Sequence, residues 1–231
     1  MNIPLSNSAA SRKSAVNAAT YAIRDKIIMR EFPRGMQLTE VQLAELCGAS
    51  RGSIRSALQE LESEGLLISH PNGRKEIAGI DRAYVEDLYS MRQMLEGKAI
   101  DVILSRDYEN ECEYIRQVIT PFSTLFSSDH NSSHIRAWED MHFHRLLIHV
   151  SGNRVLEQCW KVVGPVIWHM QSVNARHGTE GENYENLVNT QHNEIIRLLR
   201  ERNTSLRDMI WTHIDNARIT NIEILTQKNC I

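Results

Sequence analysis

The sequence is short of the features that mark exported, membrane-spanning and disulfide-bonded proteins. It holds four cysteines and five prolines in 231 residues, and it has no run of about eighteen apolar residues. The cysteines lie far apart and form no CxxC pair, which argues against disulfides and a zinc ribbon. No charged segment followed by an apolar one opens the chain. We therefore expect a cytoplasmic protein with no membrane span and no export signal.

Positive charge is also scarce, since 26 Lys and Arg stand against 29 Asp and Glu, a net charge of −3. Its distribution is uneven, because residues 1–80 hold ten basic and eight acidic side chains and the rest holds 16 and 21. A surplus this small does not drive tight binding to nucleic acid by itself. Any such binding has to come from individually placed arginines and from the pairing of two binding domains.

The segment 49–67 carries the most specific pattern in the chain. Ser50 is placed to cap a helix, and Arg51 and Arg55 project from one face near its positive end. The opposite face is an apolar stripe of Ile54, Ala57, Leu58 and Leu61. Gly65 marks the end of the helix. This pattern is typical of a recognition helix that enters a groove of duplex DNA.

The flanking segments extend the pattern. An amphipathic helix over 38–46 precedes the turn 47–49, which is the spacing of a helix-turn-helix. Apolar runs at 66–69 and 75–78 flank the turn 70–74, whose Pro, Asn and Gly predict a hairpin tip. A basic hairpin tip beside a recognition helix is a wing. The competing interpretation is a packing module with solvated arginines, but turn, cap, paired arginines and wing occur here in order.

Motif residues in 33–38, 43–44, 50–58, Leu61 and 64–66 make this part of the chain resemble the GntR family of bacterial winged-helix regulators. The resemblance implies three helices with a small β-hairpin and a duplex DNA partner. The residues expected to contact DNA are Arg34, Ser50, Arg51, Ser53, Arg55, Gly73 and Arg74. Val41 and Gly52–Ser53 depart from the usual family residues, so the base preference is not readable.

The chain after residue 80 shows no strand pattern and contains only Pro121 and Pro165. Its periodicity predicts helices at about 82–105, 109–127, 133–150, 153–176, 183–201 and 204–226. We expect a mainly α protein with a flexible tail over 1–15, a winged helix-turn-helix over 16–80 and an antiparallel helical bundle over 81–231. The first helix of the winged domain is expected from Val16 to about Arg30.

A set of polar residues in the bundle has the composition of a metal site. Asp140 and His144 lie one helical turn apart, and His192 and His213 each sit beside apolar residues in later helices. Three imidazoles and one carboxylate suit a divalent transition metal, such as zinc, nickel or manganese, with coordination positions left open. A lone histidine is more often a surface or core residue, so spacing alone is a weak signal.

The segments 88–96, 140–147, 151–153 and 192–196, followed by His213-Ile214, resemble the FCD ligand domain of the FadR-like branch of the same family. In that domain the DxxxH element and two later histidines bind a metal, which carries over to Asp140, His144, His192 and His213. The interval between the last two is one residue shorter than usual. A deletion inside a helix would rotate His213 by about 100° away from the site.

The resemblance also implies that Arg92 lies near a ligand pocket, where it could pair with a carboxylate; the alternative is a salt bridge with Glu96. The whole pattern predicts a homodimeric regulator that reads a palindromic operator and responds to a small organic acid. Repression is the expected mode, with activation as the alternative. A purely structural metal is one alternative. A metal-dependent hydrolase is the other, but the chain shows no placed general base, so we expect no enzyme.

Overall fold

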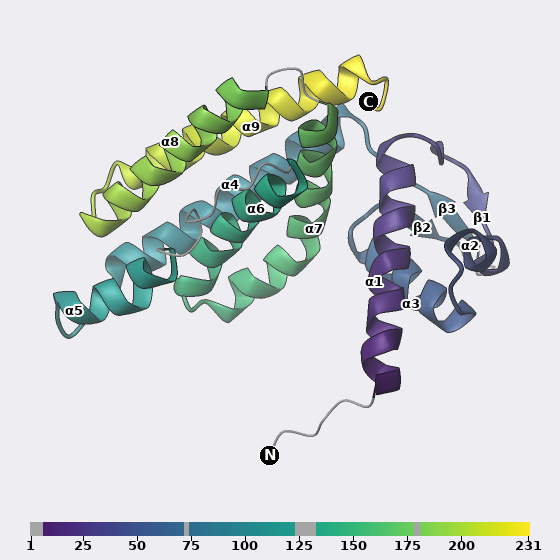
Figure 1. Cartoon of the computed structure of the whole chain (residues 1–231), viewed down its shortest axis with the longest axis horizontal. Helices are drawn as coiled ribbons and strands as arrows, with labels where there is room; N and C mark the ends of the chain where they lie inside the picture. The colour runs from purple at the N-terminus through teal and green to yellow at the C-terminus, as the bar shows by residue number, and fades with distance from the viewer. Residues whose placement is uncertain (1–6, 72–73, 123–132, 178–180) are drawn as a thin grey trace. The chain divides into compact units, whose positions relative to one another are not determined.

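The computed structural model describes residues 7–71, 74–122, 133–177 and 181–231 (Figure 1). The chain forms two compact units. The first holds the described residues up to Asp81 together with Lys228–Ile231, and the second spans Arg82–Gln227. No helix in the described part of the chain combines the length and the hydropathy needed to cross a membrane.

Three helices build the first unit: α1 (Asn7–Ile28), α2 (Glu40–Cys47) and α3 (Arg51–Ser63). Both α1 and α2 pack against α3. The apolar stripe predicted for α3 is buried in the core of this unit, which includes Ile23, Ile27, Leu43, Ile54, Leu58 and Leu61. Gly48 ends α2 with a φ of 59°, a left-handed conformation that favours glycine, and so makes the turn to α3.

A small antiparallel sheet completes this unit. The expected wing hairpin is present as β2 (Leu67–Ser69) and β3 (Lys75–Ile77), with Leu67 opposite Ile77. A third strand, β1 (Gln37–Leu38), pairs with the other edge of β3 to give the order β1-β3-β2. The sequence analysis missed β1 because two residues are too few to show an alternating pattern.

The first helix begins earlier than expected. Residues 1–15 were assigned to a flexible tail, but α1 starts at Asn7, so that assignment is corrected for 7–15. Extending a helix from its packed part costs little once the helix has nucleated, and the alanines, Arg12 and Lys13 are adequate helix formers. Residues 1–6 lie outside the described part of the chain.

The second unit is a helical bundle of α4 (Arg82–Ser105), α6 (Ser133–Val150), α7 (Arg154–His177), α8 (Gly181–Arg200) and α9 (Leu206–Gln227). These five helices begin and end within three residues of the predicted bounds. The helix α4 contacts α6, α7 and α9, and α8 packs along α9, as Figure 1 shows. The fold class, mainly α with a winged helix-turn-helix followed by a helical domain, is thereby confirmed.

The prediction of one continuous α-helix over 109–127 is wrong. The chain instead forms α5 (Glu111–Tyr114), a π-helical segment η1 (Ile115–Ile119) and a 3₁₀ turn η2 (Thr120–Phe122). Pro121 explains the loss of regularity, because it lacks the backbone N–H that an α-helix needs and clashes with the preceding turn. The remainder of the expected helix lies outside the described residues.

The last four residues also depart from the expected domain of 81–231. They belong to the first unit, where Cys230 is fully buried and the Arg30 guanidinium donates a hydrogen bond of 3.3 Å to the Asn229 carbonyl oxygen. Arg30 and Asn229 both adopt a φ of 56°. Composition gives no signal for this return of the chain, because the segment has only four residues.

A buried ion pair joins the two long helices of the first unit. The Arg24 guanidinium on α1 donates from Nε and Nη2 to the two carboxylate oxygens of Glu64, at 2.9 and 2.6 Å. Both side chains are less than a tenth exposed. Burial raises the pKa of Glu64, so Arg24 is needed to keep a charge at this position.

Replacing Arg24 by methionine should destabilise the first unit by about 3–5 kcal/mol, because the Glu64 carboxylate would be buried without its partner. Hydrogen exchange of the α1 and α3 amides measures this loss directly. The matched control is Arg82→Met, which removes an arginine from an exposed pair with Glu86 and should cost less than about 1 kcal/mol. Equal protection in both variants would contradict the assignment.

Candidate metal centre and candidate nucleic-acid interface

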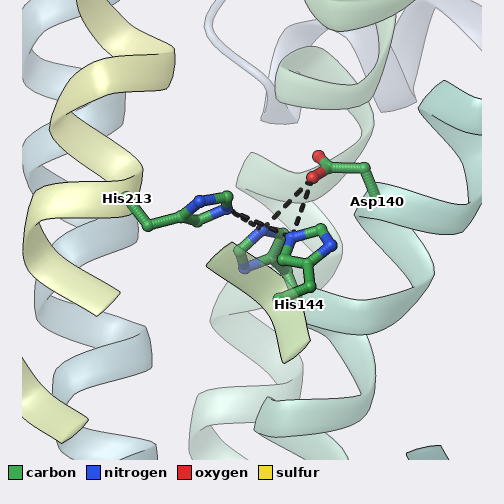
Figure 2. A group of neighbouring side chains, drawn as sticks. Asp140, His144 and His213 are labelled. Carbon is green, nitrogen blue, oxygen red and sulfur yellow. Dashed lines mark hydrogen bonds and ion pairs between the residues drawn. The ribbon is translucent and has the colours of Figure 1, made fainter. Parts of the chain in front are cut away.

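The structure brings together the four side chains that the sequence proposed as metal ligands. Asp140 and His144 come from successive turns of α6, His192 comes from α8 and His213 from α9. Figure 2 shows Asp140, His144 and His213 pointing toward one another. The three histidines are almost fully buried. The shorter interval before His213 therefore does not rotate it out of the group.

The donor atoms of this group have the spacing of a coordination sphere. The Nε2 atom of His213 lies 3.1 Å from Nε2 of His144 and 3.2 Å from Nε2 of His192. The Asp140 Oδ1 atom lies 3.2 Å from Nε2 of His192 and 3.6 Å from Nε2 of His144. Neighbouring ligands bound about 2.0–2.2 Å from one ion are themselves about 3.0–3.6 Å apart. Because all four donor atoms lie within 4.8 Å of one another, the group could hold one divalent transition metal.

The partners of two imidazole rings strengthen this fit. The Nδ1 atom of His144 lies 2.6 Å from Oε2 of Glu96, and the Nδ1 atom of His213 lies 2.8 Å from Oε1 of Gln191. These oxygens accept, so each ring carries a proton on Nδ1, and in the neutral form its Nε2 atom presents a lone pair. Two such lone pairs in contact require a positive charge between them. One proton satisfies one pair, whereas a metal ion satisfies all four donors.

The electrostatics agree with this arrangement. Burial lowers the pKa of His144, but Glu96 and Asp140 more than offset it and the pKa lies above its ordinary value. Burial and the neighbouring His144 and His192 hold the pKa of His213 well below its ordinary value. Burial alone would raise the pKa of Asp140, but the histidines hold it well below its ordinary value. Ionised Asp140 and neutral His213 are in the forms that bind metal, whereas a metal bound by His144 has to displace the proton that the raised pKa of this ring favours.

Aromatic packing fixes the third imidazole. Phe143 stacks on the His192 ring with centroids 4.2 Å apart and planes inclined by 21°. Phe122, from the irregular segment that follows α5, packs edge-on against Phe143 at 5.2 Å. The π-helical and 3₁₀ turns that the sequence analysis did not foresee therefore support the centre from one side.

Arg92 lies beside this centre, fully buried on α4. Its Nε donates to Oε1 of Glu96 at 2.8 Å, so the salt bridge considered as an alternative is present. It does not use the whole guanidinium, because Nη1 and Nη2 are buried without a hydrogen-bond partner among the described residues. The Oδ2 atom of Asp140 is also buried without a hydrogen-bond partner among the described residues. Buried, unsatisfied donors at this place are suited to a bound carboxylate.

The sequence analysis missed Glu96 and Gln191 as members of the site. Glu96 entered it only as the alternative partner of Arg92, and nothing in the sequence links it to His144, which is 48 residues away. Gln191 lies next to His192 in sequence, but its contact is with His213 on another helix. A single sequence carries no signal for contacts of this kind.

In the first unit, Ser50 caps α3 as predicted, with its hydroxyl oxygen accepting from the Ser53 backbone N–H at 3.1 Å. The Arg51 side chain is exposed and makes no hydrogen bond or ion pair among the described residues. Arg55 is exposed as well, but its Nε and Nη2 donate to the Glu40 carboxylate at 3.0 and 2.9 Å. The two arginines near the helix start therefore differ in their surroundings.

The other predicted DNA contacts divide into exposed and buried residues. Arg34 is exposed and pairs with Asp81 at 3.3 Å, and Arg74 on the wing is exposed and donates to Gln37. Ser53 is 2% exposed, because its hydroxyl lies 2.9 Å from that of Ser50 within the cap. Its side chain thus serves the helix cap, and its contact with DNA stays a prediction. Gly73 lies outside the described residues.

Comparisons with known families cover both units. Residues 16–76 match the bacterial regulatory proteins of the gntR family, and residues 87–216 match the FCD domain. An uncharacterized HTH-type transcriptional regulator of Bacillus subtilis, YdhC, is 25% identical over 78% of this chain and 79% of its own length. The probable HTH-type transcriptional regulator LgoR of Escherichia coli is 26% identical over 62% of this chain and 47% of its own length.

Solved structures show the same fold. Lar, described as controlling expression of the Listeria monocytogenes agr system, aligns with a TM-score of 0.61 and 19% identity over 90% of this chain and 97% of its own. A putative GntR regulator from Rhodococcus sp. RHA1 aligns with a TM-score of 0.56 and 18% identity over 91% and 98% of the two chains. At these identities the likeness concerns the fold alone.

Proposed function

Because the chain belongs to the GntR family of bacterial regulators and carries an FCD domain, we propose that it is a metal-dependent repressor that responds to a small carboxylate. Family membership makes it a DNA-binding transcriptional regulator rather than an enzyme. In the proposal it acts in the bacterial cytoplasm, on the nucleoid when DNA-bound. The first unit, which runs through Asp81 and includes Lys228–Ile231, reads DNA, and the second unit, Arg82–Gln227, senses the effector.

The proposed DNA contact centres on the exposed start of α3. Arg51 would reach base edges or phosphates directly, with Arg34 and Arg74 on the flanking backbone and the wing near the minor groove. Arg55 has its fork occupied by Glu40, so in the proposal it contacts DNA by exchanging that carboxylate for an acceptor on the duplex. Ser50 supports the contact by capping the helix that presents both arginines.

Two copies are needed to read a near-palindromic operator, since two-fold symmetry in the protein is then matched in the DNA. Exposed apolar side chains in the second unit support pairing of this kind. Met91 and Met94 on α4 and Trp211 on α9 are 43%, 60% and 47% exposed, and these two helices pack together. Isolated apolar side chains are common on surfaces, but these three lie on two helices that pack together.

Arg51→Ala should weaken binding to the promoter fragment of the protein's own gene. Each bidentate guanine contact is worth about 1–3 kcal/mol, and a dimer loses one in each half-site. Gel shifts at several salt concentrations measure the effect. The control Arg116→Ala removes an exposed arginine from η1 and should leave binding unchanged. Specific binding retained by the Arg51 variant would count against this helix as the reader.

The proposed metal is held by Asp140, His144, His192 and His213. The observation that carries this step is the contact between the Nε2 atoms of His144 and His213. In both rings the Nδ1 proton is donated to an acceptor, so neither Nε2 carries a proton in the neutral form. When bound, a zinc, nickel or manganese ion supplies a positive centre with open positions for a carboxylate oxygen. The protein itself holds the four donors in place, with the three histidines buried and Asp140 partly exposed.

A purely structural metal would hold the helices together without an effector. The buried Nη1 and Nη2 atoms of Arg92 favour the effector-anchoring function over this alternative, because they offer two parallel donors that the described residues leave unsatisfied. In the proposal, Nη1 and Nη2 of Arg92 would hold the effector's carboxylate, and the metal would supply a second positive charge for it. A coupling of about 1–3 kcal/mol would change operator affinity roughly 5- to 150-fold.

His192→Ala should strip the metal and leave operator binding of the effector-free protein largely intact. Elemental analysis of the purified protein and its thermal stability with and without a chelator measure the first part, and gel shifts measure the second. His149→Ala is the control, because His149 lies on α6 but is exposed and pairs with Glu157. If the His192 variant kept the wild-type metal content, this residue would not be a ligand.

Arg92→Lys should keep the metal but lose carboxylate binding, because lysine preserves the charge and lacks the planar fork. A panel of small mono- and dicarboxylic acids, titrated into the zinc-loaded protein by calorimetry, supplies the measurement. The wild type should bind at least one acid and the variant should bind it at least about tenfold more weakly. No binding of any acid to the wild type would favour the structural metal.

A further inference from the structure

We propose that Glu96 is a positioning residue of the metal centre, whose carboxylate turns His144 so that its Nε2 atom faces the ion. This inference rests on the metal site of the proposed function and adds to it a residue that coordinates nothing itself. Glu96 lies on α4, whereas its imidazole partner lies on α6, and both side chains are fully buried. The residue therefore acts across a helix interface.

Both oxygens of the Glu96 carboxylate accept a hydrogen bond, each from a different neighbour. Oε2 accepts the Nδ1 proton of His144 at 2.6 Å, and Oε1 accepts the Nε proton of Arg92 at 2.8 Å. A short, charge-assisted hydrogen bond in a buried place holds a ring strongly. While this bond is kept, the Nδ1 atom of His144 carries a proton and cannot bind the ion.

Carboxylates in this position are known to tune metal ligands in general. Accepting the remote N–H of a coordinating imidazole fixes its tautomer and makes the other nitrogen more basic. His213 has a neutral counterpart in Gln191, whose amide oxygen fixes the same tautomer without adding a charge. His144 is thus the ligand whose basicity depends on a buried negative charge.

Glu96 also links the metal ligand to Arg92. The guanidinium is anchored through Nε, which leaves Nη1 and Nη2 as the buried, unsatisfied donors. One carboxylate therefore contacts both the proposed effector anchor and the proposed metal ligand. This places the residue between the proposed effector anchor and the proposed ion.

The competing function for Glu96 is structural: it could neutralise the buried charge of Arg92 and have no effect on the ion. A double-mutant cycle separates the two, because a positioning residue acts through His144 and a structural one does not. The cycle uses the full chain as wild type, Glu96→Gln, His144→Ala and the double variant. Zinc affinity is measured by competition with chelators of known strength.

We expect Glu96→Gln to weaken zinc binding about 10- to 100-fold in the wild-type background. In the His144→Ala background it should cause no further loss. Glu194→Gln is the matched control, since it makes the same substitution on α8 at an exposed pair with Arg197 and should leave zinc affinity unchanged. A loss of equal size in both backgrounds, or no loss in either, overturns the proposal.

A second measurement needs no variant and so does not depend on folding of Glu96→Gln. In the zinc-loaded wild type, long-range ¹H–¹⁵N correlations should show His144 protonated on Nδ1 and coordinated through Nε2. Coordination through Nδ1 overturns the proposal. If the wild type binds no zinc at all, the metal site of the proposed function fails as well, whereas zinc binding weakened by His144→Ala alone removes only the part assigned to Glu96.

Discussion

The second unit is organised around one electrostatic constraint, the convergence of unshared electron pairs from three helices on a single buried point. Burying a polar atom without a partner is costly. The three imidazole nitrogens and the carboxylate oxygen would also repel one another, because each presents a lone pair. In the proposed function, a bound metal ion supplies the positive charge that all four share. Every other feature of the site serves this convergence: Phe143 holds one ring, Gln191 another and Glu96 the third.

The first unit shows how far local sequence patterns reach. The recognition helix was predictable in detail, because its cap, apolar stripe and terminating glycine all depend on neighbours within a turn or two. The buried pair of Arg24 and Glu64 was not foreseen, because its members lie 40 residues apart. The strand β1 was missed for its shortness, and the early start of α1 for its weakly apolar composition.

The metal centre was partly predictable for the same reason. Asp140 and His144 are one turn apart, so helical geometry puts them on one face, whereas His192 and His213 were candidates only as histidines beside apolar residues, and the family resemblance then supported them. The residues around them depend on how helices pack, which periodicity does not encode. Arg92 illustrates the limit: the sequence offered a salt bridge or a ligand contact as alternatives, and the structure leaves room for both on one guanidinium.

The irregular segment η1 has a consequence for how this protein tolerates change along its length. A π turn holds one residue more than an α turn, so Ile115–Ile119 sets the angular phase at which Phe122 leaves the helix. Losing a single residue there would remove the extra residue of the π turn and swing the aromatic ring by about 100°. Insertions and deletions in this stretch should therefore be far rarer among close relatives than substitutions.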